Sequence, residues 1–221
     1  MARRWWIPKL HARVVATLIS PEQAIALLDA ASGERLEALY VLALTTGMRQ
    51  GELLALKWSD LSLDAGSVHV TGSLQPTSDG LTIVEPKTAS ARRHISLTAV
   101  AVEALRRHRA SQAKERLSLG AAWDDQDLLF PNAGGRPLDV RSLVRRSFLP
   151  LLEAAGLPRI RFHDLRHTAA TLLLGQGVHP KVVAEMLGHS RISTTLDLYS
   201  HVTPTMQREA TVALDELLSG R

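Results

Sequence analysis

The spacing of apolar positions predicts helices on both sides of a short region with strand character. A helix capped by Ser20 is expected to run to about Ala31, because Gln23 completes a capping box with Ser20. Leu, Val and Ala then recur at helical spacing over residues 34–46 and again over 49–57. These patterns predict three helices in the first quarter of the chain.

The pattern changes where Val, Ile and Thr become frequent in short runs separated by Gly, Pro, Ser and Asp. Such runs are typical of strands, and those at 67–71, 81–85 and 92–97 predict an antiparallel sheet. Helical spacing then returns, and further helices are expected at 98–117, 139–155, 163–176, 180–187, from Ser193, and at 204–218. The predicted fold class is therefore mainly α with a small three-stranded antiparallel β-sheet (α+β).

Composition narrows the function classes. The chain of 221 residues is long enough for one large domain, and its formal net charge of +4 with an isoelectric point near 9.8 favours polyanionic partners. It has no cysteine, which excludes disulfides, thiol catalysis and cysteine-bound zinc. No apolar run reaches the length of a membrane span, so we expect no membrane partner and a cytoplasmic location.

The first candidate site residue is Arg49, which follows the glycine turn at Gly47 and opens a helix. Backbone N–H groups and a guanidinium can converge there on an anion. Glu52 lies three residues on, on the same helix face, and can orient Arg49. Taken alone, the pair is more typical of a surface salt bridge at a helix end.

Lys87 is the second candidate, because it is expected in the turn between the second and third predicted strands. A lysine on a hairpin tip can reach into a groove and donate a proton. An exposed lysine in a turn is also commonly just solvated.

The run F-H-D-L-R-H-T places His163 and Arg166 on one helix face, where both can address the same phosphate. His163 and His167, four residues apart, are the alternative, as metal ligands. The zinc-protease motif requires Glu directly after the first histidine, and Asp164 stands there. No third ligand is evident, so we predict no metal.

His189 and Tyr199 lie ten residues apart near the end of the chain. A tyrosine hydroxyl has a pKa near 10 and needs neighbouring bases or cations to act as a nucleophile. Most tyrosines on helices pack in cores, as expected for Tyr40 among Leu and Val. Tyr199 is flanked by Asp197 and His201, which suits a less buried position.

Four stretches, in this order, resemble the tyrosine recombinase family of phage-type integrases: T-G-M-R-Q-G-E-L-L-A-L-K-W-S-D, E-P-K-T-A-S-A-R-R-H-I-S-L, F-H-D-L-R-H-T-A-A-T-L-L-L and V-A-E-M-L-G-H-S-R-I-S-T-T-L-D-L-Y-S-H-V. The resemblance extends from about Ser20 to the end. It implies a DNA breaking-rejoining catalytic fold over 20–203, a basic arm or linker remnant at 1–19, and a helix at 204–221 that packs in cis or on a neighbouring protomer.

The resemblance also implies a reaction, site-specific recombination through a 3′-phosphotyrosine. Arg49 and Arg166 would bind the non-bridging oxygens of a DNA phosphate, and Tyr199 would attack it. Lys87 would protonate the leaving 5′-oxygen. His163 would act as a base toward the tyrosine, His189 would hold another phosphate oxygen, and Glu52 would position Arg49. No cofactor is implied, because the arginines and the lysine take the place of a metal.

The partner implied is double-stranded DNA of a mobile genetic element. The chain is expected to assemble as a homotetramer on DNA and to be a monomer without it. Exposed basic residues would contact the DNA backbone: Arg92, Arg93, Arg141, Arg145, Arg146, Arg159, Arg161, Lys181 and Arg191. Taken singly, each of these residues is at least as typical of a solvated helix face.

Three alternatives stay open at this point. The chain could be a type IB topoisomerase-like enzyme, although the run G-H-S-R-I-S-T-T-L-D-L-Y-S-H favours the recombinase branch. It could be a non-catalytic DNA-binding remnant, although the six catalytic positions are intact. Family members of full length usually carry an N-terminal core-binding domain, so we expect either a fragment of a longer integrase or a natural minimal member.

Overall fold

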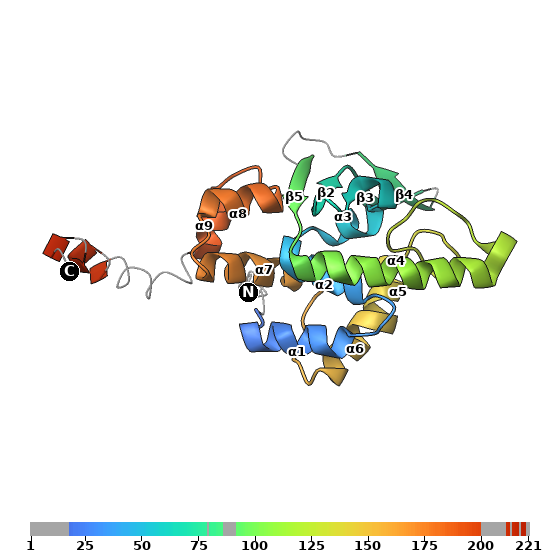
Figure 1. Ribbon diagram of the computed structural model, residues 1–221, viewed down its shortest axis with the longest axis horizontal. Helices are drawn as coiled ribbons and strands as arrows, with labels where there is room; N and C mark the ends of the chain where they lie inside the picture. Colours follow the sequence, from blue (N-terminus) through green and yellow to red (C-terminus); the bar gives the residue numbers. More distant parts are fainter. Residues whose placement is uncertain are drawn as a thin grey trace, which may run out of the picture.

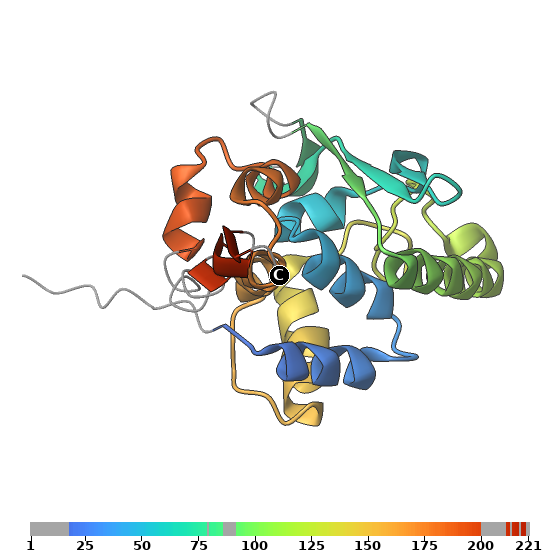
Figure 2. The ribbon, with the colours of Figure 1, turned by 60° about the vertical axis from the view of Figure 1, so that its left-hand side comes forward.

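The computed structural model describes residues 18–78, 80–85, 92–199, 211–212, 214–216 and 218–219, with the backbone alone at 197–199. Helices surround a buried central helix, and two small sheets cover one side of it (Figures 1 and 2). The predicted fold class is confirmed. Lys87 and most of the predicted helix at 204–218 lie outside the described residues.

The first helices begin and end largely where the sequence predicts. Ser20 caps α1 (Pro21–Ala31), and the Gln23 side chain accepts the Ser20 backbone N–H at 2.9 Å. The central helix, α2 (Glu37–Thr46), is buried nearly all round and packs against α1, α4 and α7. Such burial on every face explains its continuous apolar sequence. A short α3 (Gln50–Ala55) follows the turn at Gly47.

The strands differ in their pairing from the prediction. The three-stranded antiparallel sheet consists of β1 (Leu61–Ser62), β2 (Ser67–Val70) and β5 (Arg93–Ser96), and η1 (Trp58–Asp60) leads into it. The predicted strand at 81–85 instead forms a separate hairpin, β4 (Gly80–Val84), with β3 (Ser73–Thr77). It was therefore wrongly assigned to the three-stranded sheet. Strand choice is set by partners distant in sequence, which local composition does not encode.

The middle of the chain is helical. Thr98 caps α4 (Ala99–Leu119), which ends in the short η3 (Gly120–Ala122). The predicted helix at 139–155 is divided into α5 (Val140–Leu143), the π-helical turn η4 (Val144–Phe148) and α6 (Leu149–Ala154). Pro150 explains the division, because it lacks the N–H that an α-helix would donate to residue 146, and the turn before it widens.

The last described helices pack against one another at one end of the molecule. These are α7 (Asp164–Gly175), α8 (Pro180–Leu187) and α9 (Ser193–Tyr199), with α8 also touching β5. The outer end of α4 lies at the opposite end (Figures 1 and 2). Among the described residues, no helix is both long enough and apolar enough to cross a bilayer.

Candidate active site

Two glycine turns bring the candidate residues together. Gly47 ends α2 with φ +61°, and its carbonyl oxygen accepts a 2.7 Å hydrogen bond from Nη1 of Arg166. A Cβ at Gly47 would lie 2.4 Å from the Leu187 side chain, so only glycine lets α8 approach this closely. The turn thereby fixes α7 and α8 against the end of α2.

Arg49 is the residue at which α3 begins. Its own backbone N–H donates to Oε2 of Glu52 at 2.9 Å, and its Nη1 donates to Oε1 of the same carboxylate at 2.8 Å. Its Nη2 donates to the carbonyl oxygen of Gly188 at 3.1 Å. The predicted orientation of Arg49 by Glu52 is therefore present, and the guanidinium stays partly exposed toward solvent.

Arg93 is the residue whose place differs most from expectation. It was predicted on an exposed basic surface, but its side chain is 7% exposed and pairs with Glu52, Nη2 to Oε2, at 2.9 Å. The alternation along β5 explains this: Arg93 and Ile95 point inward, whereas His94 and Ser96 point outward. The prediction of Arg93 as a surface contact is therefore wrong, and period-two spacing with Ile95 was the sequence pattern that could have revealed it.

The second glycine turn closes α8. Gly188 has φ +69°, its N–H donates to Glu185, and the N–H of His189 donates to the carbonyl of Ala184 at 2.9 Å, which is a Schellman motif. The Nδ1 of His189 then forms a 2.8 Å hydrogen bond with Oγ1 of the buried Thr195 in α9. This bond fixes the orientation of the imidazole between the two helices.

Positive charge is in excess at this site. Arg49 and Arg93 pair with the carboxylate of Glu52, whose charge also acts on Arg166 without a hydrogen bond between them. Burial and the charge of Arg49 lower the pKa of Arg166 to about 9, which keeps it protonated at neutral pH. Burial, with the charges of Arg166 and Arg49, lowers the pKa of His189 to about 4. The imidazole is therefore neutral at pH 7, and the cluster carries net positive charge.

Arg166 presents a donor that no group in the described part of the chain accepts. It is 4% exposed, and its Nη2 is buried without a hydrogen-bond partner among the described residues. A buried donor without a partner costs free energy on the order of 1–3 kcal/mol. Unused donors and excess positive charge together indicate a site for an oxyanion.

His163 precedes α7 and lies beside the site. Its ring contacts that of His167 edge to face, with the centroids 5.0 Å apart. Burial, followed by the neighbouring His167 and Arg166, lowers the pKa of His163, and burial also lowers that of His167. The described residues contain no group of three or more metal-ligating side chains.

Tyr199 is the last residue of α9, the helix that holds His189 through Thr195. Its side chain lies outside the described part of the chain, as does the whole of Lys87. The structure therefore brings together Arg49, Glu52, Arg166 and His189, and it adds Arg93. Contacts of α9 with both α7 and α8 place its backbone against the same helices.

The remaining predicted DNA contacts are exposed, which fits a role in binding but does not assign one. Arg141, Arg145 and Arg146 surround a hollow of about 300 Å³ on α5 and η4. Two others have carboxylate partners, Arg92 with Glu85 and Arg161 with Asp164. The exposed set comprises Arg92, Arg141, Arg145, Arg146, Arg159, Arg161, Lys181 and Arg191.

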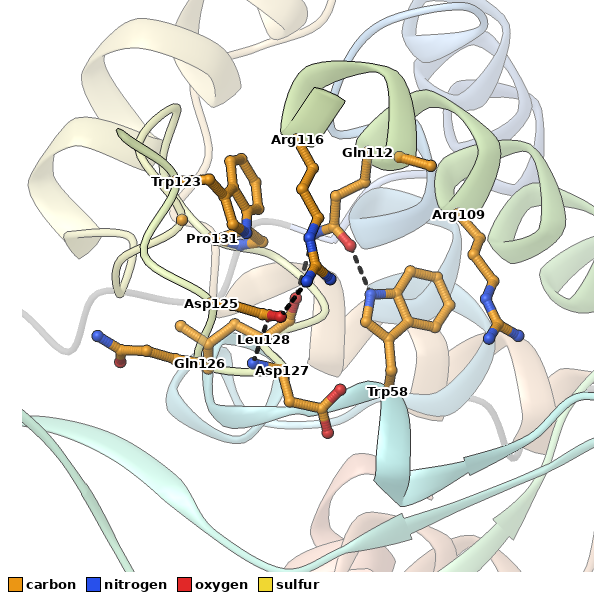
Figure 3. A pocket seen from close by; sticks show the side chains of 12 residues that line it. Trp58, Arg109, Gln112, Arg116, Trp123, Asp125, Gln126, Asp127, Leu128 and Pro131 are labelled. Carbon is orange, nitrogen blue, oxygen red and sulfur yellow. Dashed lines mark hydrogen bonds and ion pairs between the residues drawn. The ribbon is translucent and has the colours of Figure 1, made fainter. Parts of the chain in front are cut away.

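A cavity of about 380 Å³ lies far from this cluster, between the end of α4 and the loop after it (Figure 3). Its charged and polar groups have protein partners. Arg116 pairs with Asp125 at 2.6 Å, the Trp58 Nε1 donates to Gln112 at 2.5 Å, and Arg109 lies over the Trp58 ring. The cavity therefore lacks the charge imbalance that marks the candidate active site.

Comparisons with known proteins identify the family of the chain. The model of the phage integrase family matches residues 17–206. A tyrosine recombinase XerC-like protein of Caldanaerobacter subterraneus subsp. tengcongensis is 33% identical over 214 residues, covering 90% of this chain and 54% of that protein. An integrase of Streptomyces ambofaciens is 36% identical over 198 residues, covering 86% and 50%. The chain spans about half the length of these relatives.

A solved structure of the Tn1549 transposon integrase with a circular intermediate DNA superposes with a TM-score of 0.76 at 24% identity. The overlap covers 92% of this chain and 67% of that one. The fold is that of the tyrosine recombinase catalytic domain, and the chain belongs to the phage integrase family.

Proposed function

We propose that this chain is the catalytic part of a tyrosine-type site-specific recombinase that cuts and rejoins DNA through a 3′-phosphotyrosine. The observation that carries the proposal is the unused, buried Nη2 of Arg166 within a cluster of excess positive charge. A phosphodiester supplies the two non-bridging oxygens and the negative charge that such a cluster lacks. Family membership supports the choice of DNA as the source of that phosphate.

Arg166 and Arg49 bind the two non-bridging oxygens in this proposal. Negative charge builds on these oxygens as the phosphorus becomes five-coordinate, and donors already fixed in place stabilise it without reorganisation. Glu52 fixes Arg49, the carbonyl of Gly47 fixes Arg166, and Thr195 fixes His189 beside them. With Nδ1 accepting from Oγ1 of Thr195, the neutral His189 donates from its Nε2–H to a phosphate oxygen.

The covalent step assigns one role to each remaining residue. The Tyr199 hydroxyl oxygen attacks phosphorus, forming the O–P bond as the bond from phosphorus to the 5′-oxygen breaks. His163 accepts the tyrosine proton, and its lowered pKa leaves it neutral and able to do so near pH 7. Lys87 donates a proton to the leaving 5′-oxygen. Attack by a second strand's 5′-hydroxyl reverses the step and completes the exchange, with no cofactor required.

Partners and organisation follow from the same proposal. Exposed Arg141, Arg145 and Arg146 suit contacts with the DNA backbone. In the described part of the last helix, Val212, Leu214 and Leu218 are 51–75% exposed, and we assign them to contact within the chain or with another protomer of a DNA-bound tetramer. In this proposal the catalytic unit spans 20–203, and a DNA substrate suits action in the cytoplasm.

The test uses a pool of nicked duplexes with randomised positions, in which cleavage releases a short fragment and traps the covalent intermediate. The wild-type chain should form a protein–DNA adduct on a denaturing gel. Tyr199→Phe should lose the adduct completely and retain binding, since only the nucleophile is removed. Binding by the wild type without any adduct would contradict the proposal and favour a DNA-binding remnant. Relaxation of supercoiled plasmid without site preference would instead favour the topoisomerase-like reaction.

A further inference from the structure

Arg93 lies at the start of β5 with its guanidinium turned into the protein. The guanidinium donates to both oxygens of Glu52, Nη2 to Oε2 at 2.9 Å and Nη1 to Oε1 at 3.3 Å. Its Nε donates to the backbone carbonyl of Met186 at 2.6 Å. Arg93 is therefore a buried link between the carboxylate at the start of α3 and the last turn of α8.

At one end of this link, Glu52 positions Arg49. Both Glu52 oxygens serve Arg49, one through its guanidinium and one through its backbone N–H. Burial raises the pKa of Glu52, but the hydrogen bond and charge of Arg93, followed by the bonds from Arg49, outweigh burial and hold the pKa below its ordinary value. Loss of the Arg93 charge removes the largest influence that keeps Glu52 ionised.

At the other end of the link, Arg93 contacts the turn of α8 that positions His189. A Cβ on Gly188 would lie 2.8 Å from Nη1 of Arg93, so the guanidinium packs directly against the glycine turn. The turn contributes the Gly188 carbonyl that accepts from Arg49 and delivers His189 one residue later. A shift of Arg93 would therefore displace both a partner of Arg49 and the backbone that carries His189.

We propose that Arg93 is a positioning residue that holds Arg49 and His189 in register around the phosphate without touching it. The inference rests on the proposed function and extends it, because it names the side chain that couples the two halves of the site. The Arg93 guanidinium is covered by Glu52, Met186 and Gly188, so it acts through them. The strand it begins also follows directly on the segment that contains Lys87.

Arg35 offers a matched control for a purely structural arginine. It also joins one carboxylate to backbone carbonyls: Nε and Nη2 donate to Glu115 at 2.8 and 2.9 Å, and Nη1 donates to Pro131 at 3.0 Å. It lies between α1 and α2, in contact with α4 and the following loop. Replacing Arg35 therefore removes a comparable network of bonds at a distance from the site.

The experiment measures the rate of adduct formation against pH on one duplex chosen by the wild-type chain from the randomised pool. Arg93→Gln keeps N–H donors but removes the charge. Its rate should fall about 100-fold, the effect of a displacement on the order of 1 Å, while DNA affinity stays within about threefold. Arg35→Met should keep the wild-type rate in whatever fraction remains folded.

The pH profile separates positioning from stability. The charged groups around Glu52 are Arg49 from the start of α3, Arg93 from β5 and Arg166 from α7. Without Arg93, burial raises the pKa of Glu52. Arg93→Gln should therefore lose further activity as pH falls from about 8 to about 5, relative to the wild-type profile. The double variant with Glu52→Gln should lack this additional loss, and Arg93→Lys should restore the wild-type profile with only part of the rate.

The outcomes distinguish the two proposals. No adduct from the wild-type chain contradicts the proposed function itself. A wild-type adduct together with a wild-type rate and pH profile in Arg93→Gln overturns only the inference about Arg93. If Arg93→Gln does not fold, as judged by circular dichroism, Arg93→Lys decides the matter: a rate reduced about tenfold supports positioning, and a rate equal to wild type contradicts it.

Discussion

The two arginine networks of this molecule differ in how their charge is balanced. At Arg35, the carboxylate of Glu115 takes two donors and the carbonyls of Pro131 and Asn132 take the others. At the candidate active site, Arg49 and Arg93 pair with the carboxylate of Glu52, and Nη2 of the neighbouring Arg166 has no partner within the described chain.

The difference indicates what each network does. A guanidinium in which every nitrogen has a protein partner joins elements of the fold, as Arg35 joins the α1–α2 connection to α4 and the following loop. A cluster with more cations than carboxylates is stable only because the rest of the fold holds it in place. Binding of an anion would reduce the repulsion between its arginines. Such local conflict is typical of functional sites.

The largest predicted difference is catalytic. Arg166→Met should lower the rate of adduct formation by about 10³-fold, because one fixed donor to the developing charge is lost. Arg35→Met should leave that rate unchanged.

The two variants should show the reverse order in urea denaturation. Arg35→Met should lower the free energy of unfolding by about 1–2 kcal/mol, because its ion pair and carbonyl bonds are lost. For Arg166→Met, relief of repulsion should offset the lost bond to Gly47. Equal catalytic losses in the two variants would remove the distinction between the networks.

A smaller effect is expected at the glycine turn that supports the site. Gly188→Ala should lower the free energy of unfolding by about 2–3 kcal/mol, because the added Cβ combines left-handed strain with a contact against Arg93. Gly33→Ala is the matched control: Gly33 has φ +79°, and nothing lies within 4 Å of its added Cβ. Its loss should be about 1 kcal/mol, from backbone strain alone. Similar losses at both positions, measured by urea denaturation, would argue against tight packing of Arg93 on the turn.

The smallest predicted effect concerns pH. The pKa of His189 is lowered to about 4 in the folded chain, against an ordinary value of about 6.5. Between these values the unfolded chain binds a proton that the folded chain does not. The contribution of neutral His189 to the free energy of unfolding is therefore complete above about pH 6.5 and is lost as pH falls toward 4. His189→Gln should show a shallower decline in melting temperature over this range, and an unchanged decline would mean that His189 is not held neutral by its surroundings.

The sequence predicts local features well because their causes are local. Ser20 and Thr98 cap the helices they precede, and Gly47 ends α2. Arg93 was misplaced because its ion-pair partner, Glu52, lies 41 residues away and charge alone suggests a surface. The hairpin of β3 with β4 was missed for a related reason: β3 contains Pro76 and mostly exposed side chains, so it lacks an alternating apolar pattern. Lys87 and the Tyr199 side chain stay predictions.

The most direct test of the account asks whether the excess positive charge is a site for phosphate, and it does not depend on a DNA target sequence. Melting temperature is measured against inorganic phosphate at constant ionic strength and pH 7.5, for the wild type, Arg166→Met and Arg35→Met. A ligand bound only by the folded state raises the melting temperature as its concentration grows. The wild type and Arg35→Met should rise by the same increment, whereas Arg166→Met should show little rise. An equal rise in all three proteins would contradict the claim that Arg166 binds a phosphate oxygen.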